Sequence, residues 1–363
     1  MQIFLHIIYL VAGIFLVIKG GDLFVDSSIY LAKKFKIPSI IVGATIVSIA
    51  TTLPELIVST IAAAQGSYGL AVGNAVGSII CNTALVSGLS IAIVPIALKQ
   101  KSSPFKYLLL LFSGILLLFC SLDYKITWYE SLIFFTLFLV YMGYNLWDAS
   151  KQVSKQKYSK PVIITEDSLK EEALEEGHQK SLESEHLNKH DSTEKSDSEE
   201  ELKPRKMWLV ITLFILGAGM IAGGAFALVE GAKFLAMAIG ISESFVGLTI
   251  VAIGTSLPEL ITTITAIKKK DTALGYGNVV GANTLNVTLI MGMCGVISGS
   301  SGLVLTKYTL IVSIPLMIVL TAIFVLPLTF KNKSYRWQGI SLLGLYIAYI
   351  AYLVIMSSLG ITV

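Results

Sequence analysis

One string of residues occurs twice in this chain, 204 positions apart. Gly43–Ile57 reads GATIVSIATTLPELI and Gly247–Ile261 reads GLTIVAIGTSLPELI, with 11 of 15 positions identical. The same offset continues without a gap as far as Asn82 and Asn286. Register kept over so long a stretch indicates an internal duplication, so the fold must be assembled from two copies of one unit.

Both copies consist of apolar blocks. Hydrophobic residues make up 54% of the chain and charged residues only 14%, with a mean hydropathy of +0.76. A soluble domain has roughly a quarter charged residues, so this composition excludes a soluble enzyme, a nucleic-acid-binding module and a disulfide-stapled secreted domain. A membrane helix needs about 20 apolar residues. That length predicts an all-α polytopic membrane protein with ten transmembrane helices, near residues 3–32, 38–64, 69–98, 105–121, 126–147, 207–236, 243–267, 272–298, 303–330 and 337–360.

The charged residues concentrate in a single segment. Residues 151–206 hold 14 acidic and 11 basic side chains and few apolar ones, which is typical of a flexible linker loop. Elsewhere, lysine clusters follow the first, third, seventh and ninth predicted spans, and Lys125 is the clear exception to this alternation. The positive-inside rule therefore predicts a cytoplasmic linker and both termini outside.

The linker divides the chain into two five-helix repeats, residues 1–150 with the motif 43–82 and residues 207–363 with the motif 247–286. Because five is an odd number, the second repeat enters the bilayer from the opposite side. We therefore expect two inverted repeats, the architecture of secondary transporters, whose substrate site lies near the bilayer midplane between the halves.

Each copy of the string places a glutamate near the middle of an apolar block, Glu55 in one and Glu259 in the other. An ionised carboxylate at that depth costs about 2.5–3.5 kcal/mol, so it needs a partner. No basic residue lies at comparable depth in the other predicted spans, which leaves a bound cation or a proton as the counter-charge.

A proline precedes each glutamate. It cannot donate a backbone hydrogen bond, so it frees the carbonyl four residues back, at Ala50 and Gly254. Such carbonyls in a broken membrane helix must be satisfied, and cations suit them. The hydroxyls that flank the two prolines add further oxygen atoms, from Thr51, Thr52, Thr255 and Ser256.

A second repeated string reads GNAVGSIICN over Gly73–Asn82 and GNVVGANTLN over Gly277–Asn286. Its glycines allow close helix approach without any ligand role. Ser78 and Asn82 share one helix face because they are four residues apart. We expect Asn82 and Asn286 to bind or support a ligand, the alternative being plain interhelical hydrogen bonding. The candidate set contains oxygen only, which suits hard ions such as Ca²⁺ and Na⁺.

These residues resemble the two α-repeat motifs of the cation/calcium antiporter superfamily, and within it the prokaryotic sodium/calcium exchangers. The resemblance extends over nearly the whole chain outside the linker. It implies a multi-pass protein of the prokaryotic cell (inner) membrane. It also implies a metal-binding set of Thr51, Thr52, Glu55, Thr255, Ser256 and Glu259, the carbonyls of Ser48 and Ala252, and Ser78, Asn82 and Asn286.

The chain departs from the family pattern at two places. Ala282 stands where the second copy usually has a serine, so one expected Na⁺ ligand is missing and the stoichiometry stays open. Potassium-dependent members resemble this pattern but have an aspartate where Asn286 stands, which argues against K⁺ co-transport. Plant-type proton/calcium exchangers have a different string around the glutamate.

We expect a secondary active antiporter that exchanges Ca²⁺ against Na⁺ by alternating access, with both ions competing for Glu55 and Glu259. A proton-coupled Ca²⁺ exchanger is the alternative, and a cation channel a more distant one. An enzyme is not expected, since no HExxH or GxSxG string is present. The expected partners are Ca²⁺, Na⁺ or H⁺ and the lipid bilayer, with no cofactor, no nucleic acid and no required protein partner.

Overall fold

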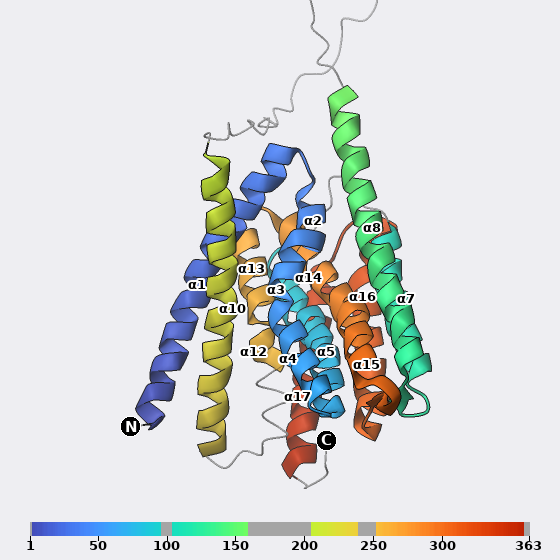
Figure 1. Cartoon of the computed structure of the whole chain (residues 1–363). Coiled ribbons are helices and arrows are strands. Elements are labelled where there is room, and N and C mark those ends of the chain that lie inside the picture. Colours follow the sequence, from blue (N-terminus) through green and yellow to red (C-terminus); the bar gives the residue numbers. More distant parts are fainter. Residues whose placement is uncertain (1, 96–103, 159–204, 239–251, 359–363) are drawn as a thin grey trace, which may run out of the picture.

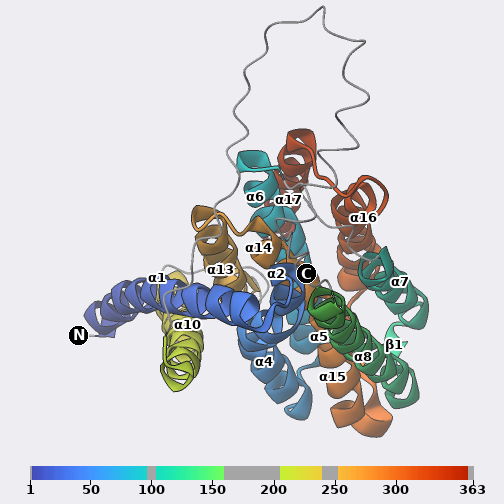
Figure 2. The same ribbon diagram turned by 90° about the horizontal axis from the view of Figure 1, so that it is seen from above.

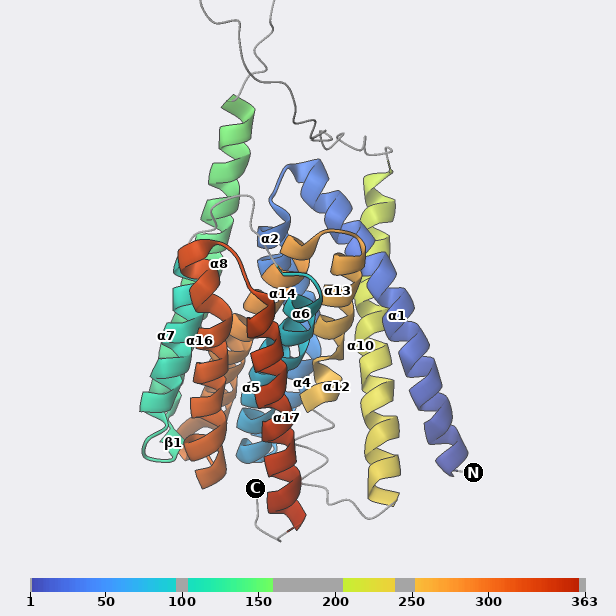
Figure 3. The same cartoon turned by 180° about the vertical axis from the view of Figure 1, so that it is seen from behind.

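The computed structural model describes residues 2–95, 104–158, 205–238 and 252–358, which form a bundle of helices (Figure 1). Most of the predicted linker, residues 159–204, lies outside the described residues, and so do residues 247–251 at the start of the second repeated string. The helix α1 begins and α17 ends at one end of the bundle, whereas α8 ends and α10 begins at the other, which we call the linker end (Figures 1 and 3).

The regular secondary structure described in the first half of the chain is helical apart from one short strand. Its α-helices and π-helical turns (η) are, in order, α1 (Gln2–Phe35), α2 (Ser39–Val42), η1 (Gly43–Val47), α3 (Ser48–Thr51), α4 (Leu53–Ala64), α5 (Tyr68–Cys81), η2 (Asn82–Ser87), α6 (Gly88–Ile93), α7 (Pro104–Cys120) and α8 (Trp128–Tyr158). The strand β1 (Lys125–Ile126) lies between α7 and α8.

The described part of the second half likewise consists of helices, short helical turns and one short strand. Its helices are α10 (Met207–Ala238), α12 (Ala252–Thr255), α13 (Leu257–Lys268), α14 (Thr272–Leu285), the π-turn η4 (Asn286–Ile290), α15 (Met291–Ser298), the 3₁₀ turn η5 (Gly299–Ser301), the π-turn η6 (Thr309–Ser313), α16 (Ile314–Lys331) and α17 (Arg336–Ser358). Strand β2 (Leu303–Val304) pairs antiparallel with β1 and joins the two halves at the end away from the linker.

The helices around the repeated strings match in length as well as in sequence. The helices α3, α4 and α5 begin and end 204 residues before α12, α13 and α14, and both π-turns that follow, η2 and η4, begin at an asparagine. In Figure 1 the chain descends from α2 through α3 to α4 and rises from α12 to α13. The duplicated sequence therefore folds into duplicated local structure that runs in opposite directions.

The apolar helices make this a multi-pass integral membrane protein. Among the described residues, seven helices are long and apolar enough to cross a bilayer, and the bent pair Ser39–Thr51 and Leu53–Ala64 makes an eighth. The helix α7 is apolar but shorter, and the predicted span 243–267 begins outside the described residues, so the count of ten stays a prediction. Large apolar side chains such as Phe15, Phe226 and Ile347 are exposed, as expected for surfaces that contact lipid.

The helices α1 and α10 pack side by side at one edge of the bundle (Figure 2). A Cβ atom on Gly217 would lie 2.7 Å from the backbone nitrogen of Phe24, and one on Gly20 would lie 2.9 Å from the carbonyl oxygen of Gly217. Only glycine permits this approach, which is how small residues pack membrane helices. Phe24 and Ile221 belong to a small apolar cluster that joins this pair to α2, η1, α13 and α14.

The larger core surrounds α5 and α14, whose side chains are buried along nearly their whole length. Two ion pairs occur at the linker end. Lys106 of α7 is buried and pairs with Asp148 of α8 at 3.0 Å, and Lys269 pairs with Asp26 of α1 at 2.6 Å. These lysines therefore neutralise acids other than Glu55 and Glu259.

The glycine contact between α1 and α10 yields a stability prediction. Gly217→Ala should destabilise the protein by about 1–3 kcal/mol, because its methyl group would overlap the backbone of α1. Gly219→Ala on the same helix is the control, since nothing lies within 4 Å of its added Cβ, and helix propensity should make it neutral or stabilising by about 0.5–1 kcal/mol. Thermal unfolding in detergent measures both, and equal effects would contradict the close approach.

Candidate cation-binding site

Two broken helices position the glutamates. The helix α3 ends at Thr51 and α4 begins at Leu53, with a bend of 46° between the two segments. Pro54 sits in the first turn of α4, where its missing N–H removes no helical hydrogen bond. The second copy breaks in the same way at Ser256. Each glutamate therefore lies in the first turn of a helix, at the positive end of its dipole.

Close packing between the halves brings the two breaks together. A Cβ on Gly43 would lie 2.2 Å from the carbonyl oxygen of Leu274, and one on Gly277 would lie 2.2 Å from that of Ile40. A Cβ on Gly281 would lie 2.4 Å from the Ser48 hydroxyl. The repeated glycines thus act as the sequence predicted, as sites of close helix approach.

Both glutamate side chains are fully buried, with 0% exposure. The Thr52 hydroxyl of the first half donates to Oε1 of Glu259 in the second half at 3.3 Å, and the carboxylates of Glu55 and Glu259 are close enough to interact electrostatically. No described residue forms a hydrogen bond with either oxygen of Glu55 or with Oε2 of Glu259. Three carboxylate oxygens are therefore buried without a partner in the described structure.

The hydroxyls of Thr51 and Thr255 lie between the halves. Thr51 Oγ1 lies 3.1 Å from Oδ1 of Asn278 and 3.3 Å from the carbonyl oxygen of Ser48. Thr255 Oγ1 lies 3.3 Å from Oδ1 of Asn74 and 3.3 Å from the carbonyl oxygen of Ala252. Each threonine therefore contacts its own helix and an asparagine of the opposite half.

The remaining predicted residues are buried around this centre. The Ser78 hydroxyl lies 3.5 Å from that of Thr255, whereas no described residue pairs with the Ser256 hydroxyl. The amide groups of Asn82 and Asn286, at the starts of η2 and η4, are fully buried and have no hydrogen-bond partner among the described residues. Plain interhelical hydrogen bonding thus does not account for either asparagine in the structure.

Sequence reasoning assigned no role to Asn74 and Asn278, although both stand in the repeated string. The signal was present: Asn74, Ser78 and Asn82 are spaced four residues apart and so form one stripe along α5. A further polar contact has no equivalent in the repeat, because Asn283 Nδ2 donates to the Thr83 hydroxyl at 2.8 Å. It ties α14 to the turn that carries Asn82.

Other polar groups support the broken helix without facing the glutamates. Tyr141 of α8 is buried and donates its hydroxyl to the carbonyl oxygen of Ala44 at 3.0 Å. That carbonyl belongs to η1, a π-turn, where the backbone hydrogen-bond pattern is irregular. The tyrosine therefore joins α8 to the backbone of the broken helix.

The arrangement offers oxygen atoms of four kinds: carboxylate, hydroxyl, amide and carbonyl. Among the described residues, no group of three or more His, Cys, Asp or Glu side chains could hold a metal ion. Two carboxylates among neutral oxygens suit a hard, partly dehydrated cation better than zinc or copper.

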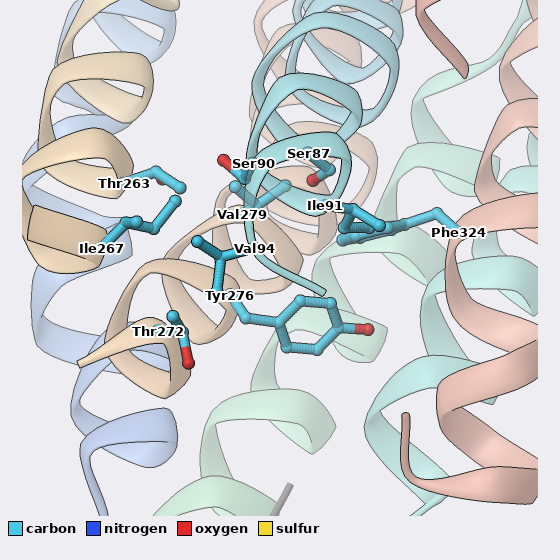
Figure 4. Close-up of a pocket in the computed structure, with 10 residues that line it drawn as sticks. All are labelled: Ser87, Ser90, Ile91, Val94, Thr263, Ile267, Thr272, Tyr276, Val279 and Phe324. Carbon is cyan, nitrogen blue, oxygen red and sulfur yellow. The ribbon is translucent and has the colours of Figure 1, made fainter. Parts of the chain in front are cut away.

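A separate pocket lies between α6, α13, α14 and α16 (Figure 4). Its lining is mainly apolar, with Tyr276 and Phe324 on one side, and its polar groups are hydroxyls such as those of Ser87, Thr263 and Thr272. The lining contains no charged side chain, so this pocket does not compete with the glutamate pair as a cation site.

Comparison with known proteins gives a consistent result. The family described as "Sodium/calcium exchanger protein" matches residues 5–147 and 209–355. An uncharacterized membrane protein of Methanocaldococcus jannaschii is 28% identical, over 94% of this chain and 96% of its own length. The sodium/calcium exchanger MaX1 of Methanosarcina acetivorans is 29% identical, over 97% of this chain and 99% of its own length. The sodium-calcium exchanger NCX_Mj, in a structure soaked with Na⁺ and Sr²⁺, superposes with a TM-score of 0.73 at 28% identity, covering 96% of this chain and 99% of that one.

The unpartnered carboxylates predict how cations change stability. Ca²⁺ should stabilise the protein by about 2.7 kcal/mol at a concentration one hundred times its dissociation constant, because it binds only the folded site. Glu55→Gln/Glu259→Gln should lose this stabilisation yet be at least as stable as the cation-free wild type, since two buried charges disappear. Thermal unfolding with and without Ca²⁺ measures both. The exposed Glu230→Gln is the control and should respond like the wild type.

Proposed function

Because the chain belongs to the sodium/calcium exchanger family, we propose that it is a secondary active antiporter that exchanges Ca²⁺ for Na⁺ across the prokaryotic cell membrane. The observation that carries the proposal is the pair of fully buried glutamates with three carboxylate oxygens that no described residue satisfies. A buried charge without a partner is strongly unfavourable, so these oxygens need a cation.

The proposed ligands surround this pair. Glu55 and Glu259 bind Ca²⁺ or share Na⁺ ions with the hydroxyls of Thr51, Thr52, Thr255, Ser256 and Ser78, the carbonyls of Ser48 and Ala252, and the amides of Asn82 and Asn286. All eleven residues are buried. Ten can offer oxygen from equivalent positions of the two repeats, and the exception is Ser78, whose equivalent is Ala282.

We propose that the two halves are inverted repeats of five membrane helices each, residues 1–150 and 207–363, joined by a cytoplasmic linker, residues 151–206. The opposite directions of α4 and α13 support the inversion. The linker end also carries the last turn of α1, with Lys33 and Lys34, and the end of α13, with Lys268. This agrees with the positive-inside rule and supports an orientation with both termini outside.

Charge balance explains why such a site would exchange ions rather than leak them. One Ca²⁺ neutralises two glutamates, as do two Na⁺ ions, and a third Na⁺ would leave one net positive charge. An empty site would leave two carboxylates unpaired in a low dielectric, so only loaded forms should reorient. We propose that α1 and α10 move together against the remaining helices, because the pair packs intimately at the edge of the bundle.

Transport in proteoliposomes tests this directly. An outward Na⁺ gradient should drive ⁴⁵Ca²⁺ uptake, and K⁺ at the same concentration and clamped pH should not. Glu55→Gln and Glu259→Gln should each abolish uptake, because the remaining carboxylate cannot neutralise Ca²⁺ alone. Glu230→Gln, at an exposed position of α10, should transport like the wild type.

Other outcomes would identify the alternatives. Uptake driven by a pH gradient alone would make the protein a proton-coupled Ca²⁺ exchanger. Ca²⁺ flux that needs no counter-ion and exceeds carrier turnover would make it a channel. Undiminished uptake by either glutamine variant would refute the proposed site.

The missing hydroxyl at position 282 gives a further prediction. Ala282→Ser supplies the oxygen that Ser78 supplies in the first half, so it should lower the Na⁺ concentration for half-maximal Ca²⁺ release by about threefold to tenfold, the effect of one hydrogen-bond-strength contact. Ser78→Ala should raise that concentration by a similar factor. Na⁺ titration of Ca²⁺ efflux measures both, and no change in either variant would place these positions outside the Na⁺ site.

A further inference from the structure

We propose that Asn74 and Asn278 are positioning residues that accept hydrogen bonds from the hydroxyls of Thr255 and Thr51, and so leave the lone pairs of these hydroxyls and of the neighbouring carbonyls open to the transported cation. The inference rests on the proposed function. It adds a role for two buried side chains that contact the candidate ligands but are not ligands themselves.

The orientation of Asn74 follows from its partners. Its Nδ2 lies 3.3 Å from the carbonyl oxygen of Glu55 and 2.9 Å from the Ser59 hydroxyl. A carbonyl oxygen can only accept, so the amide nitrogen must face it. The amide oxygen then faces Thr255 and can only accept from that hydroxyl. The partners of Asn74 thereby fix it as a hydrogen-bond acceptor for the Thr255 hydroxyl.

A threonine hydroxyl has a single hydrogen, and here it has several possible acceptors. Thr255 can donate to Asn74 or to the carbonyl of Ala252, both at 3.3 Å, and its hydroxyl also lies 3.5 Å from that of Ser78, where either group can donate. The Ala252 carbonyl already accepts from the backbone N–H of Ser256 at 3.3 Å, so a hydrogen from Thr255 would occupy the one lone pair that it has left for a cation. When Asn74 accepts the hydrogen instead, that lone pair and those of the hydroxyl stay available to a cation.

The second copy repeats this geometry across the interface. Thr51 has a similar choice, between the carbonyl of Ser48 at 3.3 Å and Asn278 at 3.1 Å, and it also lies within hydrogen-bonding reach of the Glu259 carboxylate. In both cases the asparagine belongs to the opposite half, so each half orients a hydroxyl of the other. The copies differ in one respect: no described residue accepts from Nδ2 of Asn278.

Double-mutant cycles in proteoliposomes test the proposal. The half-saturating Ca²⁺ and Na⁺ concentrations are measured for Asn74→Leu, Thr255→Val and the double variant, all close in size to the wild type. Each single variant should raise the half-saturating concentration of at least one ion about tenfold, the loss of one buried hydrogen bond. The half-saturating concentration of the double variant should be no higher than that of the single variants, because Asn74 acts only through Thr255.

The other threonine is the matched control. When Asn74→Leu is combined with Thr51→Val, the two effects should multiply and raise the half-saturating concentration about a hundredfold, since these residues do not pair. Thr255→Ser keeps the hydroxyl. In that background Asn74→Leu should therefore again raise the half-saturating concentration about tenfold. Multiplied effects of Asn74→Leu and Thr255→Val for both ions would overturn the proposal, because they would show a merely structural asparagine.

The second pair covers the case in which Asn74→Leu fails to fold. In the described structure the Asn278 side chain has a single hydrogen bond, to Thr51, so Asn278→Leu removes fewer hydrogen bonds than Asn74→Leu does. The double-mutant cycle of Asn278→Leu with Thr51→Val gives the same readout. Wild-type protein that failed to exchange Ca²⁺ for Na⁺ would refute the proposed function. Wild-type exchange with independent asparagine and threonine effects would refute only this inference.

Discussion

Two carboxylates share one buried site in a low dielectric, and the rest of the structure is arranged around them. The lysines that form ion pairs in the described structure do so at the linker end, Lys106 with Asp148 and Lys269 with Asp26. The protein offers the glutamates only helix N-termini and hydroxyl donors such as Thr52. Partial charges of this kind lower the cost of two anions but do not neutralise them. Under the proposed function the site is complete only with a cation, and that requirement is what would make it a carrier site rather than a structural one.

The duplication supplies the geometry that this charge pair needs. Two glutamates on one helix could not converge from opposite sides, whereas one on each of two oppositely directed broken helices can. Close approach then depends on glycine, because Gly43 and Gly277 leave no room for a Cβ against the facing backbone carbonyls. The same close packing lets Thr52 reach Glu259 and lets Asn74 and Asn278 reach threonines of the opposite half. Packing and chemistry thus depend on the same few small residues.

The sequence predicted what is repeated and apolar, and missed what depends on a particular contact. Burial of Glu55 and Glu259, the helix breaks and the close approach at Gly281 followed from hydropathy, proline and glycine patterns. The role of Tyr141 did not, because its partner is a backbone carbonyl 97 positions away, which no side-chain pattern identifies. The bonds of Asn74 were missed for a similar reason, since spacing gives a helix face but not the partner across it. The ion pair of the buried Lys106 with Asp148 was not predicted either, because its partner lies on the next helix.

The two halves are similar without being equivalent, and the differences between them can affect ion affinity but not the direction of transport. Glu259 accepts a hydrogen bond from Thr52 while no described residue bonds to the Glu55 carboxylate, and Ala282 lacks the hydroxyl of Ser78. In the proposed alternating-access cycle, such differences would change the affinity of each conformation for each ion, and with it the relative populations of the inward-open and outward-open forms. They cannot set the direction of net exchange. A passive carrier runs in whichever direction the Na⁺ and Ca²⁺ gradients and the membrane potential dictate, so asymmetry in the site tunes rate and apparent affinity on each side, and the gradients alone decide whether Ca²⁺ enters or leaves.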